Sequence, residues 1–178
     1  MQFEDTDIPG CSIVHTNRLE DNRGDFMKTY HEEIFRDRGI HTIWSEEYFS
    51  TSHKDVIRGM HFQTPPYDHD KLVNCISGRV LDVVVDLRTD SGNYGKVISV
   101  ELSGENGKMI FIPKGCAHGF LSLEDNSVMF YKVSQVYTAT NDMGLAWDTI
   151  GIEWPVSNPI ISVRDQNHPD FKVFKSPF

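Results

Sequence analysis

The chain has 178 residues, of which 39% are hydrophobic and 24% charged, and its formal net charge is −9. This length suits one domain with a sizeable core, and the composition is ordinary for a globular protein. The acidic balance argues against a nucleic-acid-binding protein, and no apolar run is long enough to span a bilayer, so we expect no membrane contact.

The start of the chain and its cysteines indicate where the protein works. Residues 1–5 show neither the basic nor the apolar region of a secretory signal. The cysteines, at positions 11, 75 and 116, are odd in number and widely spaced. This usage indicates a reducing compartment without a disulfide framework. We therefore expect a cytoplasmic protein.

Strand signals dominate the chain. Residues 32–37 favour a short helix that ends at Gly39. From about residue 43 to residue 137, short β-forming runs alternate with turns rich in Gly, Asn and Pro. The clearest strands are expected at 80–87, 97–102, 108–112, 120–123 and 127–133. After Gly151, four prolines and little periodicity predict a segment that wraps around the body. The pattern predicts an all-β fold, a jelly-roll or cupin-like β-barrel with few short helices, in which residues 1–178 form one domain with N-terminal strands and a wrapping C-terminal tail.

Residues 58–71 are the first candidate for an active site. Arg58, His61 and Lys71 stand here among apolar and strand-forming residues. Burying such groups is costly without a partner or a ligand, so a strand that carries them inward needs a functional reason. Singly, each has an ordinary interpretation, because His61 alone would more often be a structural histidine and Lys71 a strand-end lysine with its amine in water.

A metal centre is not expected. A metal-binding cupin would need two histidines one residue apart, a Glu, and a later histidine. The later motif is present as Pro113-x-Gly115-x-x-His118, but Lys71 stands at the Glu position and no histidine pair precedes it. Tight transition-metal binding needs three or four convergent donors. His53 and His69 lie in polar loop sequence and are expected to be solvated.

Motifs along the whole chain together resemble one known family. The central one is Arg58-Gly59-Met60-His61-Phe62-Gln63, followed by a proline loop and Lys71-Leu72-Val73. Others follow in collinear order at residues 21–26, 82–88, 112–120, 131–137, 144–148, 152–155 and 162–165. In this combination the chain resembles the dTDP-4-dehydrorhamnose 3,5-epimerase family. The resemblance implies a metal-free jelly-roll homodimer without a cofactor. It also implies epimerisation at C3, C5 or both in a nucleotide-linked 4-keto-6-deoxy sugar, within the deoxysugar biosynthesis that supplies lipopolysaccharide or other surface polysaccharides.

The resemblance assigns roles to the matched residues. His61 is the implied base, a type of residue whose pKa lies near working pH, and Asp165 holds it in one tautomer. Lys71 stabilises the enolate oxygen, and Tyr131 returns a proton. The implied substrate contacts are Arg23 (from the neighbouring subunit), Lys28, Glu46, Arg58, His118, Tyr137, Asp142 and Arg164.

The chain departs from the family pattern in two places. Lys28 stands where the family commonly has Glu, and residues 46–50, Glu-Glu-Tyr-Phe-Ser, replace Gln-Asp-Asn-x-Ser. These positions serve nucleotide and substrate binding in the family, so the nucleotide base stays open between dTDP, CDP and GDP. Two other functions also stay open: a non-catalytic jelly-roll that binds nucleotide sugars, and a 3,4-ketoisomerase.

Overall fold

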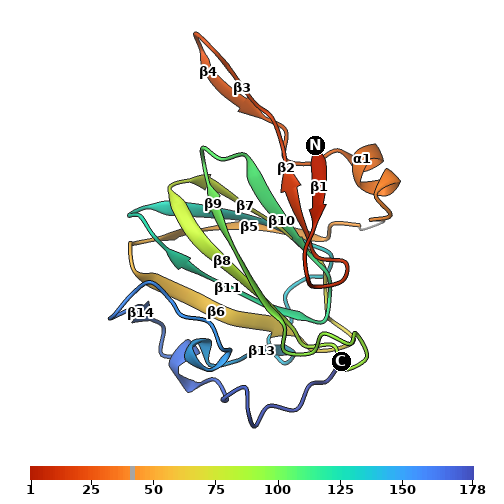
Figure 1. Ribbon diagram of the computed structural model, residues 1–178, viewed down its shortest axis with the longest axis vertical. Helices are drawn as coiled ribbons and strands as arrows, with labels where there is room; N and C mark the ends of the chain where they lie inside the picture. Colours follow the sequence, from red (N-terminus) through yellow and green to blue (C-terminus); the bar gives the residue numbers. More distant parts are fainter. Residues whose placement is uncertain (41–42) are drawn as a thin grey trace.

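The computed structural model describes residues 1–40 and 43–178. In these ranges strands form two large sheets that face each other as a jelly-roll (Figure 1). The first sheet has the order β1-β2-β10-β7-β12-β5, and the second has β13-β6-β11-β8-β9, with β14 parallel to β6. The strands of the first sheet are β1 (Gln2–Asp5), β2 (Ser12–His15), β5 (Glu46–Ser52), β7 (Lys71–Ser77), β10 (Lys108–Ile112) and β12 (Ser127–Val133). Those of the second are β6 (Val56–Gln63), β8 (Arg79–Asp86), β9 (Val97–Ser103), β11 (Cys116–Ser122), β13 (Asp142–Gly144) and β14 (Ile160–Ile161).

Successive side chains of a strand point to opposite faces of its sheet, so the strands of the second sheet contribute to two apolar clusters. One lies between the two sheets and the other lies on the outer face of the second sheet. On β8, Val84 packs into the core between the sheets, whereas Val83 and Val85 join the cluster on the opposite face. All three are fully buried. A strand buried on both faces reads as a continuous apolar run, which is why residues 83–85 are all valine.

The outer faces of both sheets are covered locally. The tail after β13 carries two 3₁₀ turns, η1 (Trp147–Thr149) and η2 (Asp165–Asn167), and packs Trp154, Phe171 and Phe178 on the second sheet. Helix α1 (Glu32–Asp37) places Phe35 on the first sheet. The tail runs along the outside of the second sheet, next to β6 and β13 (Figure 1). None of the helices in the described ranges is long and apolar enough to cross a membrane.

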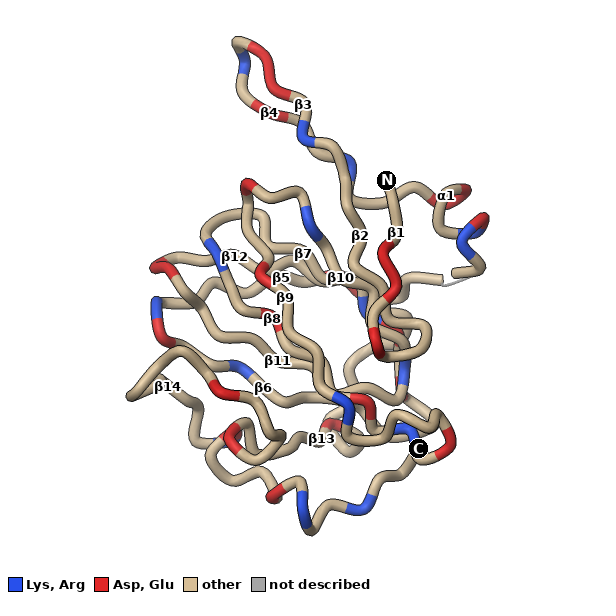
Figure 2. Tube along the Cα trace, in the orientation of Figure 1, with Lys and Arg blue, Asp and Glu red and all other residues tan. Residues whose placement is uncertain are grey.

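A hairpin stands away from this body. Strands β3 (Arg18–Asp21) and β4 (Gly24–Met27) pair only with each other and extend from the top of the first sheet (Figure 1). Acidic and basic residues both lie along it (Figure 2). Leu19 and Phe26 are also exposed on it.

Most predicted elements are confirmed within a residue. Helix 32–37 and strands 108–112 and 127–133 match the observed bounds, and Gly39 follows the helix at φ +86°. The strand predicted at 120–123 begins earlier, at Cys116, because β11 pairs with β8 from Cys116 onward. His118 therefore lies inside a strand of the second sheet, where its backbone is fixed by pairing on both sides.

Candidate active site

A cavity of about 680 Å³ opens between the two sheets. Strands β6 and β11 of the second sheet line one side, and β5, β7 and β12 of the first sheet line the other. Ten of the twelve residues expected at the site lie in its wall: Glu46, Arg58, His61, Lys71, His118, Tyr131, Tyr137, Asp142, Arg164 and Asp165. Residues up to 119 positions apart in sequence thus meet in one pocket.

His61 and Asp165 form a close pair in this wall. The imidazole Nε2 lies 2.8 Å from Asp165 Oδ1, while Asp165 Oδ2 accepts the Gly59 N–H at 3.2 Å. Although burial opposes it, hydrogen bonding to His61 and Gly59 lowers the pKa of Asp165 to about 2. An ionised carboxylate only accepts, so Nε2 of His61 carries the proton and Nδ1 keeps the lone pair. The pKa of His61 is lowered, chiefly by burial, which keeps the ring neutral and able to accept a proton.

Lys71 begins β7 and brings a buried cation into the pocket. Its side chain is 7% exposed, and Nζ donates to the backbone oxygen of His61 at 3.2 Å. Burial lowers its pKa from 10.5 to about 8, against the opposing effect of Asp142 and Asp82. An ammonium in such surroundings acts strongly on any negative charge that develops beside it.

Tyr131 faces the cavity from β12. It is 6% exposed, and burial raises its pKa well above the ordinary value, with a further contribution from Tyr48. Tyr48 lies directly opposite on β5, and the two rings stack at 4.7 Å with an interplanar angle of 18°. The Tyr131 phenol is therefore protonated at neutral pH and can serve as a proton donor.

His118 is held by a partner that the sequence did not reveal. Its Nε2 lies 2.8 Å from Oδ2 of Asp82, and both side chains are almost fully buried. Asp82 is on β8, where its side chain shares the inner face with Val84. The alternation along β8 could have placed Asp82 on the inner face. It could not have shown the contact with His118, because Phe120 and not His118 lies directly opposite Asp82.

Charged and polar groups at the pocket mouth form a second network. Arg164 makes an ion pair with Asp142 at 2.7 Å, and the Tyr137 hydroxyl donates to Asp142 at 3.3 Å. The backbone N–H of Tyr137 donates to Oε2 of Glu46 at 2.8 Å. Arg58 is anchored by hydrogen bonds to Ser52 Oγ and Thr51 O, both at 3.0 Å, and lines the pocket beside them.

Two expected contacts lie outside this cavity. Arg23 is on the protruding hairpin, paired with Asp21 and 85% exposed, and Lys28 directly follows that hairpin. Neither lines the pocket of its own chain.

His53 is exposed as expected, whereas His69 is only partly exposed. His69 lines the pocket and contacts the amide of Gln63, and burial lowers its pKa to about 4. The preceding loop folds back against Gln63, which accepts the Thr138 N–H on its other side. Local polarity therefore gave no signal of its burial.

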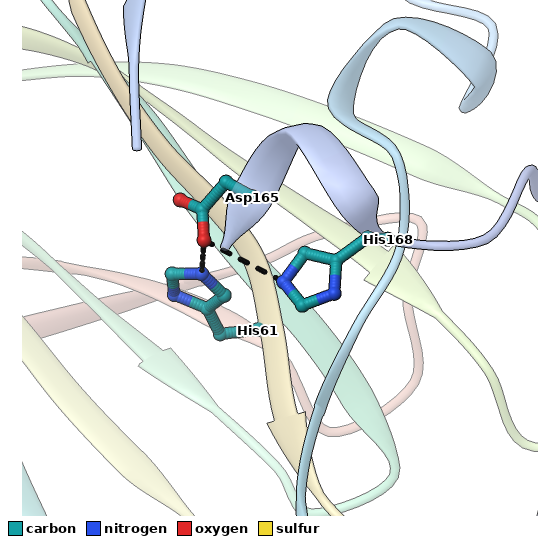
Figure 3. Close-up of side chains that lie close together, drawn as sticks. All are labelled: His61, Asp165 and His168. Atoms are coloured by element: carbon teal, nitrogen blue, oxygen red, sulfur yellow. Dashed lines mark hydrogen bonds and ion pairs between the residues drawn. The ribbon is translucent and has the colours of Figure 1, made fainter. Parts of the chain in front are cut away.

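Three side chains could together approach a metal ion. His61, Asp165 and His168 offer ligand atoms within 4.8 Å of one another (Figure 3). However, the guanidinium Nε of Arg164 lies 3.7 Å from Asp165 Oδ1, so a fixed positive charge already occupies the space beside the carboxylate. The donor set therefore fits a hydrogen-bonded imidazole pair better than a metal centre.

Comparisons with known proteins agree over nearly the whole chain. The family model described as dTDP-4-dehydrorhamnose 3,5-epimerase matches residues 5–173. A curated enzyme of that name from Methanothermobacter thermautotrophicus is 41% identical over 171 residues, covering 93% of this chain and 92% of that protein. The crystal structure of such an epimerase from Bacillus anthracis, with TDP and pyrophosphate bound, has a TM-score of 0.92 at 32% identity and covers 95% of this chain and 98% of that one. The Legionella pneumophila enzyme in complex with dTDP-4-keto-L-rhamnose has a TM-score of 0.93 at 30% identity and covers 98% of this chain and 94% of that one.

Proposed function

The chain belongs to the dTDP-4-dehydrorhamnose 3,5-epimerase family and is a sugar-nucleotide epimerase, and from this premise we propose how its cavity performs the reaction. The substrate is a nucleotide-linked 4-keto-6-deoxy sugar. Inversion at C3 or C5 begins with removal of a proton from a carbon next to the C4 ketone. The site must supply a base, a stabiliser for the enolate, and an acid on the other face.

His61 is the base. With Nε2–H donated to Asp165, its Nδ1 lone pair takes the carbon proton, and the C–H electron pair moves into a carbon–carbon double bond. The imidazolium that forms is stabilised by the ionised carboxylate of Asp165.

Lys71 stabilises the C4 oxygen as it gains negative charge. The buried ammonium is held by the His61 carbonyl, so it needs no reorganisation when the enolate forms. No cofactor is required, because the fixed ammonium of Lys71 stabilises the negative charge that develops on the C4 oxygen.

Tyr131 is the acid. When the enolate collapses, the phenol O–H donates its proton to the carbon from the other face, and the phenolate is left behind. The observation that carries the proposal is that His61 lies on β6 of one sheet and Tyr131 on β12 of the other, with the cavity between them. A ring held between the sheets meets the base and the acid on opposite faces, as inversion requires.

Groups at the mouth bind the rest of the substrate. Arg58 and Arg164 suit the diphosphate, because guanidinium groups bind phosphate oxygens in pairs. His118, Tyr137 and Asp142 contact the sugar, and Glu46 stands where the nucleotide base enters. Relatives are named for dTDP sugars, but here Glu46 is engaged by Tyr137, so base preference is a point to measure.

Residues 1–178 act as one cytoplasmic epimerase domain that works as a homodimer. Three free, buried cysteines suit a reducing compartment. The hairpin β3–β4 exposes Leu19 and Phe26, extends from the body (Figure 1), and contributes no residue to the pocket of its own chain, which suits contact with a second copy. Arg23 and Lys28 then contribute to the partner's site. Deleting residues 18–27 should abolish dimerisation in sedimentation; a deletion that stays dimeric and active would contradict this arrangement.

The test is proton exchange in D₂O with dTDP-, CDP- and GDP-linked 4-keto-6-deoxy sugars. We expect deuterium to enter C3, C5 or both with inversion, and His61→Ala to lose exchange by more than about a thousandfold. His53→Ala, which removes an exposed histidine, is the control. Binding without exchange would identify a sugar-binding protein instead, and a product with its keto group at C3 would identify a 3,4-ketoisomerase.

A further inference from the structure

His168 lies beside the His61–Asp165 pair but has no role in the chemistry above. Its Nε2 is 3.5 Å from Asp165 Oδ1, the same oxygen that His61 approaches, and the two imidazole rings meet edge to face with centroids 5.7 Å apart (Figure 3). Nε2 is buried and makes no regular hydrogen bond within the described residues. A buried polar atom aimed at a reactive carboxylate calls for an explanation.

The local backbone brings His168 to this position. Asp165 opens the 3₁₀ turn η2, in which side chains at i and i+3 eclipse each other. His168 is the residue at i+3. The spacing Asp-x-x-His therefore carries the second imidazole to the same side as the carboxylate.

Gly144 provides the space for the ring. It lies on β13, directly opposite His61 in the pairing with β6. A Cβ at Gly144 would lie 2.3 Å from His168 Nε2 and 2.5 Å from Cδ2, so the imidazole rests on the bare Cα of the glycine. Any larger residue at position 144 would push His168 away from Asp165.

The surroundings of His168 determine its protonation state and its tautomer. Burial, followed by the repulsion that a protonated His61 would exert, lowers the pKa of His168 against the opposing effect of Asp165, so the ring is neutral near pH 7. A neutral ring whose Nε2 faced the ionised Asp165 with a lone pair would be repelled. Nε2 therefore carries the proton and His168 points an N–H donor at the same oxygen that His61 uses.

We propose that His168 is a positioning residue that sets the basicity of His61, acting as a second imidazole donor on the carboxylate of Asp165. This rests on the proposed role of His61 as base. If Oδ1 of Asp165 interacted with His61 alone, it would stabilise the imidazolium form of His61 more strongly, and an imidazolium cannot accept a carbon proton. By sharing Oδ1, His168 keeps more of His61 in the neutral, reactive form.

The other charged groups around His61 stay constant in this comparison. Asp165 and Arg164 face it from the tail, Lys71 faces it from β7, and Asp142 faces the same cluster from β13. None of them is altered by a change at position 168.

The test is NMR titration of the His61 ring in the resting enzyme, combined with the pH profile of kcat/KM. His168→Leu removes the donor and should raise the pKa of His61 by about half a unit, the scale of one weak hydrogen bond. The acid limb of kcat/KM should move to higher pH by the same amount. His168→Gln restores an N–H donor near the Nε2 position and should return both values close to wild type, while His53→Leu should change neither.

Gly144→Ala gives an independent perturbation. It should shift the pKa of His61 in the same direction, and should add little in a His168→Leu background, because both changes remove the same donor. Equal pKa values for His61 in wild type, His168→Leu and His168→Gln would overturn the proposal, as would equal shifts in both variants. If the pKa of His61 moves but the acid limb does not follow, His168 tunes His61 as proposed while the assignment of His61 as base fails.

Discussion

Replacing Asp165 with Asn should switch His61 to its other tautomer while leaving the position of the ring unchanged. In the wild-type protein, Oδ2 of Asp165 accepts the Gly59 N–H and Oδ1 accepts the His61 N–H. An amide has one oxygen and one NH₂, and the fixed Gly59 donor will take the oxygen. The NH₂ then faces His61, which must present a lone pair at Nε2 and hold its proton at Nδ1. The nitrogen that should receive the carbon proton is blocked.

The size of the effect follows from two quantities. Loss of the correct tautomer and of the charge that stabilises the imidazolium should lower kcat by about a thousandfold or more, on the order of 4 kcal/mol. Stability changes separately. The pKa of Asp165 falls from 3.8 to about 2 on folding, and at about 1.4 kcal/mol per unit this stabilises the ionised form by about 2 kcal/mol. Because the folded pKa is depressed, that contribution is present above about pH 4 and is lost as the pH falls toward 2.

The assay is deuterium incorporation into the 4-keto sugar, measured by NMR, with urea unfolding at pH 7 and pH 3. Asp165→Asn should exchange at least about a thousandfold more slowly, and its stability deficit should shrink as the pH falls. Asp148→Asn, a change in an exposed acid of η1, is the matched control. Exchange within tenfold of wild type, in a variant that folds and binds the nucleotide sugar, would refute the reasoning.

Three further substitutions test other parts of the site and fold. Lys71→Met should lower kcat at least a hundredfold and raise the free energy of unfolding by up to about 3 kcal/mol at pH 7. The pKa of Lys71 is about 8 instead of 10.5, so the buried ammonium destabilises the fold, and does so fully below pH 8. Kinetics and urea unfolding check both effects, and an active or destabilised variant would contradict them. Tyr131→Phe should abolish inversion but keep deuterium exchange, since His61 can still remove and return a proton on its own face of the sugar. NMR should therefore find deuterium in sugar of unchanged configuration. Loss of exchange together with inversion would argue against a separate acid. Gly59→Ala should cost more than about 2 kcal/mol in thermal unfolding, because Gly59 has φ +145° and a Cβ there would lie 2.6 Å from the Cα of Gly119; a stability close to wild type would show that the strands can separate without penalty.

Sequence patterns predicted the strands well because their causes are local. Residues 108–112 and 127–133 are apolar or alternating runs between Gly-, Asn- and Ser-containing turns, and these turns fix where pairing stops. The jelly-roll class follows from the number and spacing of such runs. The β11 start was missed because Cys116 and Ala117 have weak strand propensity and are held by pairing with β8.

The site was predictable only where motifs marked it. His61, Lys71, Tyr131 and Asp165 came from the collinear family pattern, and the structure places all four around one cavity. Asp82, His69 and His168 were missed or misjudged, because their importance depends on what lies opposite them after folding. The pairing of Asp82 with His118 arises across adjacent strands, and the burial of His69 arises from the fold of a loop. Only His168 had a local signal, its i+3 spacing from Asp165.

The two-sheet architecture itself accounts for the stereochemical side of the proposed reaction. A single flexible loop carrying both base and acid would allow either group to reach either face of the sugar. Here His61 and Tyr131 belong to strands paired on both sides within separate sheets, so neither backbone can move toward the other without breaking a ladder. Lys71 is on β7, the strand next to that of Tyr131 in the first sheet, where it lies opposite Val133. Its Nζ donates to the His61 carbonyl of the second sheet, and this hydrogen bond connects the two sheets. The cation that should hold the enolate is therefore also a contact that keeps base and acid at a fixed separation, which is why its loss should affect inversion more than substrate binding.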